Sequence, residues 1–130
     1  MKIIVNQDDL EEVFESIYPF NLKRSLKFVE KNTNLTNLLK EFDAIIERNQ
    51  IQVIYKKNDS KIIACKVRVA DKDNRRGKSS GYRVIALIDY HQELTFVFDI
   101  YSKIGSGRKG DISAEEKEKL ISIFDAYVEN

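Results

Sequence analysis

The spacing of apolar residues changes along this 130-residue chain, and that change limits the folds it can adopt. In residues 1–50, apolar side chains recur every three to four positions, which is typical of amphipathic helices. Residues 51–103 instead alternate apolar and polar side chains, which is typical of strands with one buried face. The helical spacing returns in residues 113–128, which begin with the capping-box sequence Ser113-Ala-Glu-Glu116.

These three segments predict a single α+β domain over residues 1–130. Its parts are an N-terminal helical part (1–50), a sheet (51–103) and a C-terminal helix (113–128). Short polar turns between the strand-like runs predict an antiparallel sheet of four or five strands. Helices would cover one face of this sheet, and the other face would stay open to solvent. The strand-like runs are residues 51–56, 61–70, 81–89 and 94–102.

The last strand-like run shows the period of two over its whole length. Leu94, Phe96, Phe98 and Ile100 are expected to point to one side of the sheet. The intervening residues, which end with Tyr101, are expected to point to the other side.

Charge is concentrated in the middle of the chain. Residues 61–83 contain eight Lys and Arg against two Asp, a net charge of +6. Residues 1–20 and 111–130 each carry a net charge of −4. A basic block of this kind indicates a polyanionic partner, although a charge run by itself is also typical of a solvated loop.

The phase of the strands predicts where these cations lie. Lys66 and Arg68 alternate with apolar residues in the strand-like run 61–70. If the apolar side packs on helices, Lys66 and Arg68 face solvent, and Arg83 in the next antiparallel strand can join them. Cations that converge on an open sheet face can bind phosphate.

Several short segments from residue 62 to the C-terminus resemble the RelE/ParE toxin superfamily, in particular its HigB-like branch. The resemblance begins with the strand Cys65-Lys-Val-Arg-Val-Ala70, the turn Arg76-Gly-Lys-Ser-Ser-Gly81 and the strand Tyr82-Arg-Val-Ile85. It continues in Phe98-Asp-Ile-Tyr-Ser-Lys103 and in Asp111-Ile-Ser113. The family turn usually has two glycines where this chain has Ser80-Gly81, and the stretch 104–110 is longer than the family's spacer.

The resemblance implies a RelE-like fold and a cytoplasmic toxin of a type II toxin–antitoxin system. Such a toxin is a metal-independent mRNA endoribonuclease that acts on ribosome-bound mRNA and so inhibits translation. The ribose 2′-hydroxyl attacks the adjacent phosphate, and the 5′-oxygen leaves. The implied partners are mRNA, the ribosome and a cognate antitoxin protein, and no cofactor is implied.

Matching this chain to the family motifs nominates four catalytic cations: Lys66, Arg68, Arg83 and Lys103. Lys66 would be a base or a phosphate anchor, because a lysine crowded by like charges can act as a base. Arg68 would stabilise charge, Arg83 would hold the scissile phosphate, and Lys103 would be an acid or a stabiliser. On this basis, Arg83→Ala should abolish toxicity and leave folding intact.

A second group of residues is expected to contact RNA without taking part in the chemistry. Tyr101 could stack on a base, since aromatic side chains commonly bind bases in this way. The predicted RNA-binding residues are Lys72, Arg75, Arg76, Lys78, Tyr101, Arg108 and Lys109.

Other residue patterns argue against metal, thiol and membrane functions. No cluster of His, Asp or Glu has metal-ligand spacing, so no metal site is predicted and activity in EDTA is expected. Cys65 is expected to be a buried, inert thiol, and His91 is expected to lie in an exposed turn. The first residues show no apolar stretch or cleavage site typical of a signal peptide, and no apolar run is long enough to span a membrane, so a cytoplasmic protein is expected.

Two other functions stay open on the sequence. One is a ParE-like poison of DNA gyrase that acts by protein contact. The other is a catalytically silent module that binds RNA or the ribosome.

Overall fold

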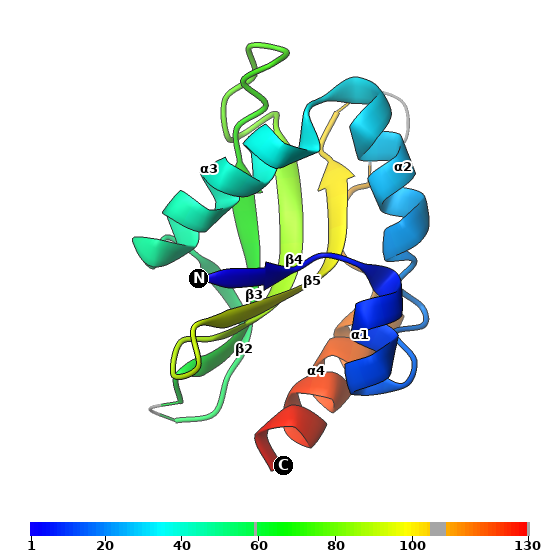
Figure 1. Ribbon diagram of the computed structural model, residues 1–130, viewed down its shortest axis with the longest axis vertical. Helices are drawn as coiled ribbons and strands as arrows, with labels where there is room; N and C mark the ends of the chain where they lie inside the picture. The colour runs from blue at the N-terminus through cyan, green and yellow to red at the C-terminus, as the bar shows by residue number, and fades with distance from the viewer. Residues whose placement is uncertain (59, 105–108, 130) are drawn as a thin grey trace.

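The computed structural model describes residues 1–58, 60–104 and 109–129, which form a five-stranded sheet with helices packed on it (Figure 1). The strands are β1 (Lys2–Ile4), β2 (Gln52–Tyr55), β3 (Ile62–Val69), β4 (Tyr82–Asp89) and β5 (Leu94–Ser102). The helices are α1 (Gln7–Phe14), α2 (Leu22–Asn32), α3 (Leu35–Glu47) and α4 (Ala114–Glu129).

The sheet has the strand order β1-β5-β4-β3-β2. Strands β2 to β5 form the predicted antiparallel meander, which confirms the α+β class. The prediction of a purely antiparallel sheet is wrong at one edge, because β1 pairs in parallel with β5, with Lys2 opposite Leu94. β1 lies inside the segment predicted to be helical. Three residues are too few to show a period of two, and their partner is far away in the sequence.

Asparagine side chains cap the first three helices. Asn6, Asn21 and Asn34 precede α1, α2 and α3, and each accepts a hydrogen bond from the backbone N–H three residues later. Each cap satisfies a donor that the first helical turn cannot pair internally. Pro19 lies between α1 and α2, as expected for a residue that interrupts a helix.

The helices cover both faces of the sheet, not one. α3 lies across β3, and α2 follows β5 (Figure 1). α4 packs on the face opposite α3, where Tyr127 donates to Asp89 and Phe124 contacts Tyr55. The one-face prediction was wrong because β4 is buried along its whole length, so both of its faces need cover. Its continuous run of apolar residues is the signature of such a strand.

The alternation of β5 is interrupted by a register shift. Asp99 pairs with Ile85, but Val97 pairs with the next residue, Ala86. An extra residue of this kind is a β-bulge, and it moves the side chains beyond it to the other face. Phe96 and Tyr101, which were predicted on opposite sides, therefore lie on the same face.

None of the helices within the described ranges combines the length and the apolar character that a membrane span requires.

Candidate active site

The structure brings three of the four nominated cations to one end of the sheet. Arg68 on β3 lies directly opposite Arg83 on β4, and Arg83 in turn lies opposite Tyr101 on β5. Lys66 is two residues before Arg68 on the same strand, so it points to the same face. This is the face on which α4 packs, but these residues lie towards the other end of the strands from Asp89.

The fourth cation joins the group through the segment that follows β5. Lys103 Nζ donates to the carbonyl oxygen of Gly110, at 2.5 Å. The next residue, Asp111, accepts a hydrogen bond from Lys66 Nζ at 3.1 Å and one from the Tyr101 hydroxyl at 3.5 Å. We call Lys66, Arg68, Arg83 and Lys103 the cation cluster, and Asp111 is the carboxylate in contact with it.

Asp111 is ionised at neutral pH. Partial burial alone would raise the pKa of its carboxyl group. The hydrogen bond from the Ile112 N–H, together with the nearby charges of Lys66 and Lys103, outweighs burial and holds the pKa below its usual range. In the sequence, Asp111 stands out only as part of a family motif. Its position two residues before the capping box of α4 is the sequence feature that could have indicated a fixed position for its side chain.

Arg83 has a different environment from the one expected. Arg83 is only 4% exposed, and its guanidinium donates to the carbonyl oxygens of Lys78 and Ser79 at 2.8 and 3.1 Å. Burial lowers the pKa of Arg83, and the neighbouring Arg68 lowers it further. Arg83 therefore holds the turn before β4 and forms the floor of the cation cluster, whereas Arg68 is exposed on its surface.

A polar groove of about 360 Å³ lies beside the cluster. Gln52 on β2 pairs with Lys66 on β3, so the edge strand forms one wall of this groove. Its lining combines cations and amides, which are groups that bind phosphate and the polar edges of bases. The lining residues are Asn49, Gln50, Ile51, Gln52, Lys66, Arg68 and Lys78.

The basic loop between β3 and β4 contributes one of its cations to this groove. Lys78 lines the groove and is exposed. Lys72 instead pairs with Glu41 of α3 at 2.9 Å, and Arg76 lies 4.0 Å from buried Asp71. Arg75 is exposed and has a positive φ of 57°. Arg108, also predicted to bind RNA, lies outside the described residues.

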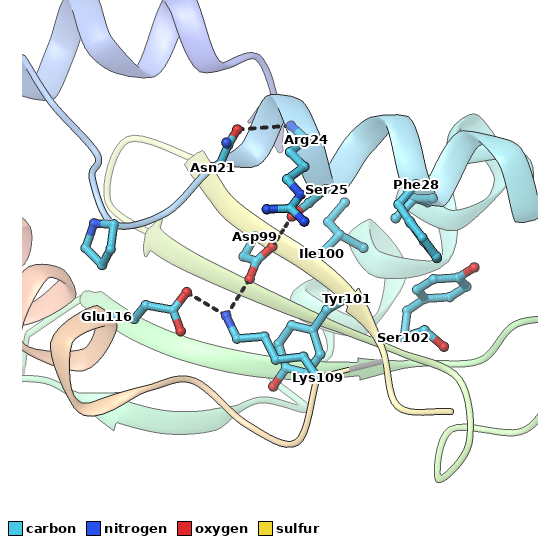
Figure 2. A pocket seen from close by; sticks show the side chains of 13 residues that line it. Asn21, Arg24, Ser25, Phe28, Asp99, Ile100, Tyr101, Ser102, Lys109 and Glu116 are labelled. Atoms are coloured by element: carbon cyan, nitrogen blue, oxygen red, sulfur yellow. Dashed lines mark hydrogen bonds and ion pairs between the residues drawn. The ribbon is translucent and has the colours of Figure 1, made fainter. Parts of the chain in front are cut away.

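Lys109, another predicted RNA contact, is occupied by two carboxylates (Figure 2). Its Nζ lies 2.9 Å from Asp99 of β5 and 2.5 Å from Glu116 of α4, and the same nitrogen is 5.2 Å from the centre of the Tyr101 ring. Asp99 also accepts a hydrogen bond from Ser25 of α2, at 2.7 Å. These contacts line a cavity of about 300 Å³ between α2, β5 and the start of α4. Lys109 thus joins these elements and is not part of the cation cluster.

Replacing Lys109 by methionine should lower the free energy of unfolding by about 3 kcal/mol, the lower end of the usual cost, because it leaves two largely buried carboxylates without their cation. Burial by itself lowers the pKa of Lys109, but its contacts with Glu116 and Asp99 raise the pKa overall. The stabilisation by Lys109 is therefore present at neutral pH and is lost as the pH rises through this raised pKa. Urea denaturation at neutral pH measures the change. Lys117→Met on the exposed side of α4 is the control, and equal stability of the two variants would contradict the prediction.

Comparison of the chain with family models, with curated proteins and with solved structures found no match.

The two other reactive side chains lie where the sequence placed them. Cys65 is fully buried, and burial raises the pKa of its thiol. His91 is exposed in the turn between β4 and β5. Within the described ranges, no group of three or more His, Cys, Asp or Glu side chains is arranged to hold a metal ion.

Proposed function

We propose that this protein has a RelE-like fold and is a toxin of a type II toxin–antitoxin system, a metal-independent endoribonuclease that cleaves ribosome-bound mRNA. The observation that carries the proposal is that Lys66, Arg68 and Arg83 share one end of a sheet face, where the ionised carboxylate of Asp111 contacts Lys66 and lies near Lys103. The groove, which Lys66 and Arg68 line, would give a single-stranded RNA access to this side of the cluster.

The cation cluster supplies charge stabilisation for attack by the 2′-hydroxyl. The phosphate gains negative charge in the transition state, and cations already fixed in place stabilise this charge without reorganisation. Arg68 is exposed at the groove and can donate two parallel hydrogen bonds to phosphate oxygens. Arg83 is buried beside Arg68 and holds the turn before β4 by donating to the carbonyl oxygens of Lys78 and Ser79.

The two lysines have different parts in this reaction. Lys66 already donates to a carboxylate, and this contact favours the role of phosphate anchor over that of base. Lys103 Nζ donates to the carbonyl oxygen of Gly110, next to Asp111, and from this position its ammonium group would give a proton to the 5′-oxygen. The groove cations, including Lys78, would bind the RNA backbone on either side of the scissile phosphate.

A cognate antitoxin belongs to this proposal. Because Arg68 and Lys78 are exposed at the groove, an acidic or helical element of the antitoxin could cover this groove and exclude RNA.

The proposal is tested by adding the purified protein to a translating extract and mapping the ends of the cleaved mRNA. Attack by the 2′-hydroxyl predicts 5′-hydroxyl ends together with 2′,3′-cyclic phosphate ends, and cleavage that depends on translation. Products with 5′-phosphate ends would contradict the proposed chemistry. Intact mRNA accompanied by trapped gyrase–DNA complexes would favour the gyrase-poison alternative, and ribosome binding without cleavage would favour a silent binding module.

A further inference from the structure

The carboxylate of Asp111 is held by only one of its two oxygens. Oδ1 accepts from the Ile112 N–H at 2.8 Å, from Lys66 Nζ at 3.1 Å and from the Tyr101 hydroxyl at 3.5 Å. Oδ2 has no hydrogen-bond partner among the residues that the structure describes, and the Asp111 side chain is 63% exposed. One oxygen thus fixes the group beside the cation cluster, and the other is free to accept a proton from a bound molecule.

Other groups that could act as a base are occupied or distant. The carboxylates of Asp99 and Glu116 bind Lys109, and Glu116 also accepts from the Ser113 N–H. His91 lies in the turn at the opposite end of β4 from Arg83. In the described part of the chain, Asp111 is the carboxylate that contacts the cation cluster and keeps an open oxygen.

The backbone around Asp111 is anchored on both sides. Two residues earlier, Lys109 is bound to β5 and to α4 through Asp99 and Glu116, as Figure 2 shows. Two residues later, Ser113 and Glu116 form a reciprocal capping box at the start of α4. A proton-transfer group needs such support, because its reach must match hydrogen-bond distance to the reacting hydroxyl.

We propose that Asp111 is the general base of the cleavage reaction, with Oδ2 as the atom that accepts the proton. This inference rests on the proposed ribonuclease function. The 2′-hydroxyl transfers its proton to Oδ2, the 2′-oxygen forms a bond to phosphorus, and the bond between phosphorus and the 5′-oxygen breaks. The Lys103 ammonium group gives a proton to the leaving 5′-oxygen. Water then returns a proton to Lys103 and removes one from Asp111, so the enzyme is restored.

The first test is Asp111→Asn, which keeps the size of the side chain and an oxygen that can accept from the Ile112 N–H. Single-turnover cleavage of ribosome-bound mRNA should fall by on the order of 10²–10⁴-fold, the usual contribution of a proton-transfer group. Ribosome binding should be unchanged or tighter, because a negative charge near the phosphate is removed. Glu115→Gln is the matched control: it removes an exposed carboxylate nearby in sequence and should cleave at the wild-type rate.

A second variant separates a base from a merely structural carboxylate. Asp111→Glu retains the proton-accepting group, so it should cleave at least tenfold faster than Asp111→Asn while both variants melt within a few degrees of wild type. If Asp111→Asn cleaved at a rate within threefold of the wild-type rate, the proposal would be overturned. Asp111 would then only compete with the phosphate for the cations. A loss that follows weaker ribosome binding or a lowered Tm would also overturn it. Absence of cleavage by the wild-type protein would instead reject the ribonuclease function.

Discussion

Replacement of Arg68 by glutamine should lower the single-turnover rate of mRNA cleavage by on the order of 10²–10³-fold, the usual loss for removal of one fixed donor to a transition-state charge. Arg68 is exposed at the groove beside Lys66, and its charge lies next to that of Arg83. Glutamine keeps most of the length of the side chain but removes the positive charge and the planar fork of donors. Folding should be unaffected, because surface substitutions away from special features usually change stability little.

Lys61→Gln is the matched control for this variant. Lys61 is exposed just before β3, at the opposite end of the strand from Arg68, and its loss changes the net charge by the same amount. The two variants are compared by the cleavage rate in a translating extract and by thermal melting. A wild-type rate for Arg68→Gln would remove Arg68 from the chemistry of the cation cluster, whereas an equal loss in both variants would indicate a general effect of charge on ribosome binding.

Replacement of Gly81 by alanine should lower the free energy of unfolding by about 3 kcal/mol, at the upper end of typical overpacking costs. A Cβ at this position would overlap the carbonyl oxygen of Val69 and lie 3.0 Å from the backbone nitrogen of Asp71. Backbone atoms at the end of β3 cannot move aside without disturbing the sheet. Because Arg83 binds the carbonyls of the same turn, the variant should also lose cleavage activity.

Gly77→Ala in the same turn is the control for Gly81→Ala. A Cβ at Gly77 would meet no atom within 4 Å, so its stability should match wild type or rise slightly. Thermal melting should show a Tm lower by roughly 10 °C for Gly81→Ala, given the usual relation between free energy and Tm for a domain of this size. A Gly81→Ala variant as stable as Gly77→Ala would contradict the close packing of this turn.

The structure changes the expected consequence of Arg83→Ala. From the sequence, Arg83 was an exposed cation whose removal would leave the fold intact. Its burial and its hydrogen bonds to Lys78 and Ser79 mean that removal would leave two carbonyl groups without these donors. Arg68, which is exposed, is therefore the better variant for separating chemistry from folding.

Local patterns in the sequence were sufficient for most of the secondary structure and for the face on which the cations lie. Strand alternation depends only on neighbouring residues, and it placed Lys66 and Arg68 together on the face opposite Val67. Likewise, the capping box at Ser113 predicted the start of α4 to within one residue.

Features that depend on residues far apart in the sequence were decided by the tertiary structure. The parallel pairing of β1 and the packing of α4 on the cation face both arise from contacts between the ends of the chain and the sheet. Asp111 reaches Lys66, 45 residues away, because the ion pairs of Lys109 hold the residues just before Asp111 beside β5. The sequence by itself therefore determined which cations share a strand face, since that follows from the period of the backbone. Only the folded chain decided which carboxylate meets them, because such contacts depend on how distant segments pack.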